Sequence, residues 1–192
     1  TSITGGLKVV MKNIDIKGHR IYDEEPCTHL YRDRGGRTPG LKAEYFNNSN
    51  LGGMPLMSDY VDGLNFYWGN GTPHPDFLGT DNFSIRYTGY LRVPASGEYT
   101  LVLSSDDASR MWIDDAMVLD NWGDHSFRGS ELTINLQANR DYAIRVDYTE
   151  SEGEAGIRLG YRIAQVDNLA TDAALCDAVI VTAGFGEKAE KE

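Results

Sequence analysis

The chain has 192 residues, of which 41% are hydrophobic and 10% aromatic, so it can bury a core of its own. Its formal net charge is −11. Because nucleic acids and anionic membranes attract basic surfaces, this charge argues against both as partners, whereas neutral sugars and divalent cations remain compatible. The sequence contains no apolar run of about 18 residues, so we expect no membrane-spanning helix.

Residues 1–39 differ in character from the middle of the chain. Short apolar stretches at 7–11 and 20–22 are typical of a helix end and a strand, and the Gly- and Arg-rich segment 32–39 ends in Thr-Pro. We therefore expect residues 1–39 to be an N-terminal flank that is part of an α/β domain, with 32–39 as a linker.

The middle of the chain alternates apolar and polar residues with the period of a β-strand. The alternating apolar positions are Ile85, Tyr87, Leu91 and Val93 in one segment, and Tyr142, Ile144, Val146 and Tyr148 in another. Residues 94–97 and the pair Asp114-Asp115 have turn composition. Half-buried strands joined by turns predict an antiparallel β-sandwich, which we place at residues 40–163.

Residues 164–192 predict a third kind of structure. Residues 168–176 have a helix-forming composition, and 178–184 are a continuous apolar run of the kind found in parallel sheets covered on both faces. A Glu-rich segment follows. We expect a helix, a strand and a Glu-rich loop that complete the α/β domain begun by residues 1–39, so that the sandwich is an insertion.

The segment 97–122 resembles the signature of the PA14 domain, a β-sandwich found in glycosidases, fungal adhesins and bacterial toxins. It reads as strand, acidic loop with Asp106-Asp107, strand, tight turn, strand. Residues 40–46, 65–69, 81–89 and 142–148 resemble further blocks of the family, in order. The resemblance implies a mainly β, PA14-like antiparallel sandwich.

The C-terminal segment resembles family 3 glycoside hydrolases, which are mostly β-glucosidases. The resemblance covers residues 174–187 and the acidic residues after them, and it implies that Glu192, or Glu190 in a shifted register, is the general acid/base. The nucleophile of that family lies on a barrel domain that nothing here resembles. The other interpretation of this segment is a solvated charged tail.

Together the two resemblances imply part of an enzyme that removes terminal β-linked glucose from oligosaccharides or glycosides. The PA14 insert would shape the substrate entrance and the leaving-group site. The expected partners are the oligosaccharide or glycoside substrate and the remaining domains of the parent glycosidase. The isolated chain would be inactive because it lacks the nucleophile, and no cofactor would be required for catalysis. The alternative is a calcium-dependent carbohydrate-binding module without catalysis.

Calcium is the candidate ligand of the acidic loop. In sugar-binding PA14 adhesins an Asp-Asp pair joined by a cis peptide holds a calcium ion that chelates sugar hydroxyls, and an Asn on the penultimate strand contributes. The resemblance places Asp106, Asp107 and Glu150 at these positions, all of them oxygen donors. The alternative is structural, with both aspartates capping the turn by accepting hydrogen bonds from backbone amides.

The remaining candidates are aromatic residues, one histidine and two cysteines. Trp68 and Trp122 are candidate sugar-binding platforms, whereas we expect Trp112, within a strand, to belong to the core. We expect His125 to be a hydrogen-bonded structural residue. Cys27 and Cys176 match no metal or redox motif, and free buried thiols are favoured over a disulfide.

Overall fold

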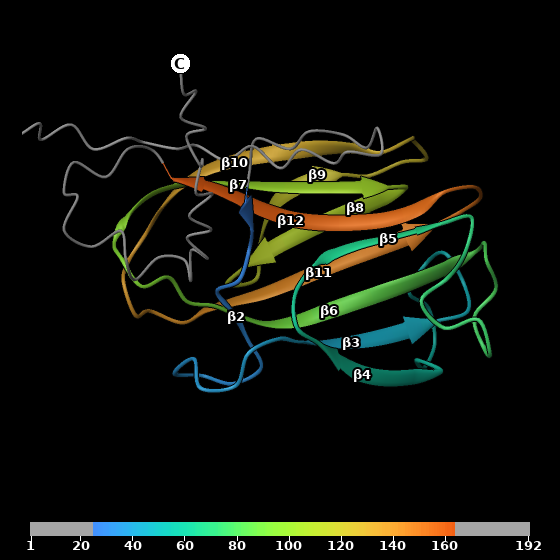
Figure 1. Ribbon diagram of the computed structural model, residues 1–192, viewed down its shortest axis with the longest axis horizontal. Helices are drawn as coiled ribbons and strands as arrows, with labels where there is room; N and C mark the ends of the chain where they lie inside the picture. The colour runs from blue at the N-terminus through green and yellow to red at the C-terminus, as the bar shows by residue number, and fades with distance from the viewer. Residues whose placement is uncertain (1–24, 164–192) are drawn as a thin grey trace, which may run out of the picture.

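The computed structural model describes residues 25–163, and these form β-strands and connecting loops without a helix (Figure 1). The strands make two sheets in which every pairing is antiparallel. The predicted antiparallel β-sandwich is therefore confirmed. Residues 1–24 of the expected N-terminal flank at 1–39, and the whole expected C-terminal flank at 164–192 with Cys176, Glu190 and Glu192, lie outside the described residues.

The five-stranded sheet has the order β1-β12-β7-β10, with β5 also paired to β12. Its strands are β1 (Glu25–Pro26), β5 (Asn65–Gly69), β7 (Gly97–Asp106), β10 (Arg128–Leu136) and β12 (Ala155–Ile163).

The seven-stranded sheet has the order β4-β3-β6-β11-β8-β9, with β2 also paired to β6. Its strands are β2 (Leu30–Tyr31), β3 (Leu41–Phe46), β4 (Met57–Val61), β6 (Phe83–Leu91), β8 (Ala108–Ile113), β9 (Ala116–Asn121) and β11 (Tyr142–Glu150). Strands β1 and β2, which precede residue 40, pair with β12 and β6.

The core lies between the two sheets and follows the alternation of the sequence. The buried apolar side chains of β6 and β11 include those expected, namely Ile85, Tyr87, Leu91, Tyr142, Ile144, Val146 and Tyr148, and Phe83 is buried in addition. Facing them from the other sheet are Leu101, Leu103, Ile157 and Leu159. The thiol of Cys27 is free and buried among these apolar side chains, and burial raises its pKa to about 12.

Four connections cross from one sheet to the other at the same end of the sandwich. One is segment 70–82 between β5 and β6, and the three crossings that follow β7, β9 and β11 lie close together. The first of these three is immediate, since β7 ends at Asp106 in one sheet and β8 begins at Ala108 in the other. The segments 122–127 and 151–154 make the other two crossings, from β9 to β10 and from β11 to β12. Registers bring them together, because Asp106 pairs with Gly156 and Ser105 with Arg128.

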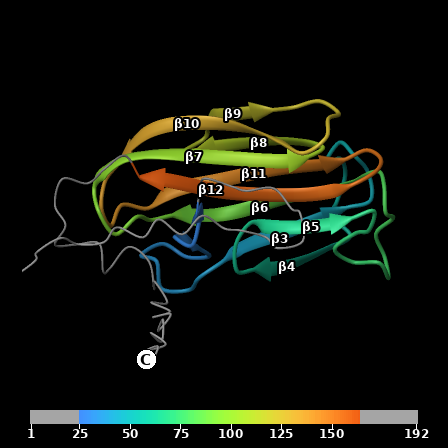
Figure 2. The ribbon, with the colours of Figure 1, turned by 45° about the horizontal axis from the view of Figure 1, so that its top comes forward.

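The described chain begins and ends at the opposite end of the sandwich. Glu25 pairs with Tyr161, and Ile163 pairs with Tyr99 near the start of β7. From Tyr99 to Asp106 the strand rises about 23 Å. In Figure 2 the arrowheads of β12 and β7 accordingly point to opposite ends.

A two-residue hairpin turn joins β8 to β9. Asp114 and Asp115 both have positive φ, 47° and 66°, as the predicted turn requires. The Asp114 carboxylate also accepts hydrogen bonds from the amide of Ala143 and from Arg140. The turn is therefore anchored at Asp114, whereas Asp115 is exposed and provides mainly its backbone conformation.

We predict opposite effects of two substitutions at Asp115. Asp115→Gly should stabilise the domain by up to about 1 kcal/mol, since Gly adopts positive φ without steric cost. Asp115→Val should destabilise it by about 1–3 kcal/mol, since a β-branched residue is strained there. Urea unfolding measures both, and equal stability of the two variants would contradict the turn assignment.

Candidate functional site

The three crossings enclose a surface pocket of about 380 Å³. Each crossing contributes to its wall. The lining residues are Asp106 and Asp107 from the first, Asp124, His125 and Ser126 from the second, and Glu152 and Glu154 from the third. Segments far apart in sequence thus place five carboxylates around one opening.

The inner part of the pocket is the aspartate pair, whose side chains are buried and whose connecting peptide bond is cis. Asp106 Oδ2 accepts a hydrogen bond from the amide of Phe127 at 3.0 Å. Asp107 accepts from the amides of His125 at 3.0 Å and Ser151 at 2.9 Å, one on each carboxylate oxygen. The pair therefore fastens the second and third crossings to the first, which gives it the structural role considered from the sequence.

Two hydroxyl groups hold the main chain of the pair. Tyr148 donates to the carbonyl oxygen of Asp106 at 2.6 Å, and Ser105 Oγ donates to that of Asp107 at 2.6 Å. Both hydroxyl-bearing residues are fully buried. The orientation of the two carboxylates is thus fixed from behind by core residues.

Glu150 lies behind the aspartate pair at the end of β11 and is 0% exposed. Its Oε2 lies 3.1 Å from the Tyr148 hydroxyl, and its Oε1 is buried without a hydrogen-bond partner. Burial, and then the negative charge of Asp107, raise the pKa of Glu150 to about 8.

Protonation of Glu150 also satisfies the hydrogen bonding of Tyr148. The tyrosine has one hydroxyl proton, and the Asp106 carbonyl can only accept, so the shorter bond takes that proton. The hydroxyl oxygen accepts from the amide of Gly156 at 3.1 Å. A protonated Glu150 can donate to it as well, which makes the neutral carboxyl the form that fits this arrangement.

The pKa of Asp106 is raised for the same two reasons as that of Glu150. Burial, followed by the charge of Asp107, raises the pKa of Asp106, while the amide of Phe127 opposes the shift. Within residues 25–163, no group of three or more His, Cys, Asp or Glu side chains is close enough to hold a metal ion alone. A cation at this pocket would therefore need further oxygen ligands, which calcium takes readily from carbonyls, hydroxyls and water.

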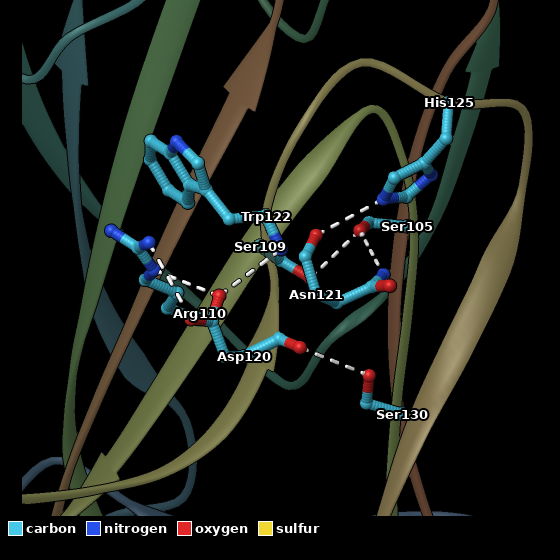
Figure 3. A network of polar contacts seen from close by, with 8 residues as sticks. All are labelled: Ser105, Ser109, Arg110, Asp120, Asn121, Trp122, His125 and Ser130. Carbon is cyan, nitrogen blue, oxygen red and sulfur yellow. Dashed lines mark hydrogen bonds and ion pairs between the residues drawn. The ribbon is translucent and has the colours of Figure 1, made fainter.

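A polar network beneath the second crossing is centred on Asn121, the last residue of β9 (Figure 3). Its side-chain Nδ2 donates to Ser105 Oγ at 3.1 Å and to the main-chain carbonyl of Arg128 at 3.2 Å. The main-chain carbonyl oxygen of Asn121 lies 3.0 Å from His125 Nε2. Asn121 thus links the strand under the aspartate pair to the loop that walls the pocket.

His125 has the structural role expected of it. In addition to the contact with Asn121, its Nδ1 lies 3.0 Å from the carbonyl of Ser126. Both ring nitrogens therefore face main-chain oxygens.

The three tryptophans occupy different environments. Trp122 is 38% exposed, with the Arg110 guanidinium 4.3 Å from its ring centroid, and its ring and that of His125 point to opposite sides of Asn121 (Figure 3). Trp68 packs against Phe66, 5.4 Å between centroids, and also against Phe83 and Tyr148. Their roles as sugar platforms stay predictions, and neither ring lines the pocket.

The expectation that Trp112 belongs to the core is wrong. It is half-buried on the outer face of the seven-stranded sheet, and the guanidinium of Arg145 lies 3.8 Å from its ring centroid. Because Met111 and Ile113 on either side point inward, Trp112 must point outward.

Sequence reasoning missed the exposed acidic residues of the pocket, Asp124, Glu152 and Glu154. They lie in turns, where charged residues are ordinary and carry no motif. The topology could have pointed to these residues, because the turns that follow β9 and β11 lie at the end of the sandwich where β7 ends.

Comparison with known proteins defines the class to which this fold and pocket belong. The chain belongs to the PA14 domain family, which it matches over residues 37–169.

Among curated proteins, the anti-sigma-I factor RsgI3 of Acetivibrio thermocellus is 32% identical over 127 residues, 66% of this chain. The chain spans only 19% of the length of that relative. A solved anti-sigma factor domain-containing protein from Clostridium clariflavum is 29% identical, with a TM-score of 0.61 over 75% of this chain and 49% of the other.

Two more distant solved structures share the fold. A β-glucosidase from Kluyveromyces marxianus, in complex with glucose, is 17% identical, with a TM-score of 0.57 over 73% of this chain and 18% of the enzyme. An epithelial adhesin domain from Candida glabrata, in complex with β-lactose, is 14% identical, with a TM-score of 0.53 over 77% and 91% of the two chains. Separately, none of the residues described forms a helix long and apolar enough to cross a membrane.

We predict that Glu150 makes the metal-free domain less stable as the pH rises. The pKa is about 8 in the folded protein against an ordinary value of 4.5, so the folded state binds the extra proton between these values. The free energy of unfolding should then fall with increasing pH across that window, by at most about 1.4 kcal/mol per pH unit.

Urea unfolding of wild type and Glu150→Gln in chelator, from pH 5 to pH 9, measures the effect, with Glu98→Gln at the opposite end as the matched control. The difference in stability between Glu150→Gln and wild type should grow in favour of the variant as the pH rises. A difference that does not change with pH would show that Glu150 titrates normally.

Proposed function

We propose that the described domain is a carbohydrate-binding module whose ligand is held at the pocket of the aspartate pair through a bound calcium ion. One observation carries the proposal. The carboxylates of Asp106 and Asp107 are buried at the floor of an open pocket, their main-chain carbonyls are held by Tyr148 and Ser105, and a Glu150 oxygen buried behind them has no hydrogen-bond partner. Structural anchoring alone requires neither the opening nor the unpartnered oxygen.

The residues present suit calcium in chemical type. Asp106 and Asp107 would hold the ion, and Glu150 would join them as a third ligand only by moving toward the pair, since no three such side chains of the described residues are close enough as they stand. All three supply the hard oxygen ligands that calcium prefers. The bound ion would supply a point of attachment for pairs of sugar hydroxyls. The amides of Phe127, His125 and Ser151 keep the two aspartates in place whether or not the ion is bound.

The comparisons support a binding role that is independent of the rest of the protein. The same fold occurs in proteins named as an anti-sigma factor, a β-glucosidase and an adhesin, and the last was solved with a disaccharide. A domain attached to such different proteins contributes what its own surface can do. For this domain the pocket between the three crossings is the feature best suited to that contribution.

We expect calcium to stabilise the domain and to be required for sugar binding. The melting temperature should rise with calcium, corresponding to about 2.7 kcal/mol at a hundredfold excess over the dissociation constant. Affinity electrophoresis against neutral soluble polysaccharides, namely xyloglucan, xylan, mannan and mixed-linkage β-glucan, should show retardation that chelator abolishes.

Two variants make the experiment specific. Asp107→Asn keeps one acceptor oxygen for the backbone amides but removes the charge, and it should abolish both the calcium-dependent stabilisation and the retardation. Asp59→Asn removes an exposed charge on β4, away from the pocket, and should retain both. A melting temperature that is the same in chelator and in millimolar calcium would leave only the structural role.

A second candidate function is an insert in a family 3 glycosidase that limits substrate length near the active site. The observation that favours it is the pairing of Glu25 with Tyr161, which brings the two ends of the described chain to neighbouring strands. Domains inserted into others join at such adjacent ends. The flanks with Glu190 and Glu192, and the boundaries at 39/40 and 163/164, are part of this proposal.

In this second case, the purified 192-residue chain should show no turnover of an aryl β-glucoside. Retaining glycosidases need two carboxylates across the scissile bond, and the chain would supply Glu192 alone. The assay compares wild type with Glu192→Gln, prepared in parallel. Turnover that is lost in the variant would show that the division of catalytic residues is wrong.

A further inference from the structure

The outer part of the pocket carries a charge pattern that the calcium proposal does not use. Asp124, Glu152 and Glu154 are exposed and line the opening, and we refer to these three residues as the acidic rim. They are separate from the buried pair of Asp106 and Asp107.

Positive groups do not balance the rim. Among the described residues that line the pocket there is no Lys or Arg, and His125 is the one basic side chain. Of the nearby arginines of the network, Arg110 forms an ion pair with Asp120 at 2.9 Å, and Arg128 donates to the neutral side chain of Asn121 at 3.2 Å and does not line the pocket. A divalent cation on the aspartate pair would cancel two of the five negative charges that line the pocket, so the opening would remain negative.

We infer that the acidic rim selects the ligand by charge, so that the site accepts neutral and amino-substituted glycans and rejects glycans that carry uronic acids. The inference rests on the proposed carbohydrate-binding function. A carboxylate on a sugar near Glu152 or Glu154 would face like charge with no cation lining the pocket to compensate it. A protonated amine at the same place would gain from those charges.

Hydrogen bonds hold the loop that carries Glu152 and Glu154. The amide of Ser151 is bonded to Asp107, the Ser151 hydroxyl donates to Asp124 at 2.9 Å, and the amide of Gly153 donates to Asp81 at 3.2 Å. Glu152 and Glu154 alternate with these anchored positions. Their side chains can therefore be altered without removing a bond that holds the loop.

The test uses three tetrasaccharides with one β-1,4-linked backbone. These are cellotetraose, its glucosamine counterpart at mildly acidic pH, and its C6-oxidised glucuronate counterpart, each titrated calorimetrically into the full chain with calcium. The double variant Glu152→Gln/Glu154→Gln is compared with Glu98→Gln/Asp115→Asn, which changes the net charge equally at the opposite end of the sandwich.

We expect wild type to bind the glucosamine tetramer at least as tightly as cellotetraose, and the glucuronate tetramer about tenfold more weakly at low salt. The rim variant should reduce this spread to within about twofold, and high salt should do the same in wild type. The control variant should keep the wild-type order.

The outcomes separate the two proposals. If cellotetraose binds but the rim variant leaves the ratios between the three ligands unchanged, the rim does not select by charge while the binding function stands. If the glucuronate tetramer binds most tightly, the inference is overturned outright. If neither cellotetraose nor any neutral polysaccharide binds, the binding function fails, and the inference fails with it.

Discussion

The pocket depends on one arrangement, in which the carboxylates of Asp106 and Asp107 accept hydrogen bonds from the backbone amides of two other crossings. Loops that connect the two sheets of a sandwich have no ladder partner of their own, and their amides need acceptors. Here two adjacent carboxylates accept hydrogen bonds from three such loop amides. Charge-assisted hydrogen bonds are stronger than neutral ones, so the pair can hold both loops in one conformation.

That arrangement has an electrostatic cost, and the neighbouring residues show how it is limited. Two adjacent buried carboxylates repel each other, and burial followed by the charge of Asp107 raises the pKa of Asp106. The amide of Phe127 opposes this shift at Asp106. Glu150 lies behind the two aspartates, and its Oε1 accepts no hydrogen bond. In the absence of a cation, protonation removes the cost of burying a charge on this carboxylate. A cation placed on the pair would oppose the same repulsion, so the features that strain the metal-free domain are those that favour binding one.

The sandwich could be predicted from the sequence because strands and turns are marked by residues that lie close together in the chain. The alternation of apolar and polar residues on β6 and β11 determines which face of each strand is buried. Asp114 and Asp115 mark the hairpin turn because aspartate tolerates the positive φ that the turn requires. The resemblance also pointed to the aspartate pair. The orientation of Trp112 was misjudged because its size was weighed above the alternation of its neighbours, although that alternation places it outside.

The rest of the site could not be obtained in the same way, because it is a property of topology. Asp124 and Glu152 are 28 residues apart and become neighbours only because β9 and β11 both end on the side where β7 ends. The donors to Asp107 are main-chain amides, which any residue would supply, so no side-chain pattern marks them.

The position of the chain ends completes the argument for a binding role. The pocket lies at one end of β7, and the two ends of the described chain lie toward the other, about 17 Å along the strand for Glu25 and about 23 Å for Ile163. The described chain therefore begins and ends on the side away from the pocket. The strands between the two ends are rigidly paired, and the loops of the pocket are tied to buried aspartates rather than to that side. Such a domain can present the same pocket from different parent proteins, because its attachment makes no demand on the residues that form the pocket.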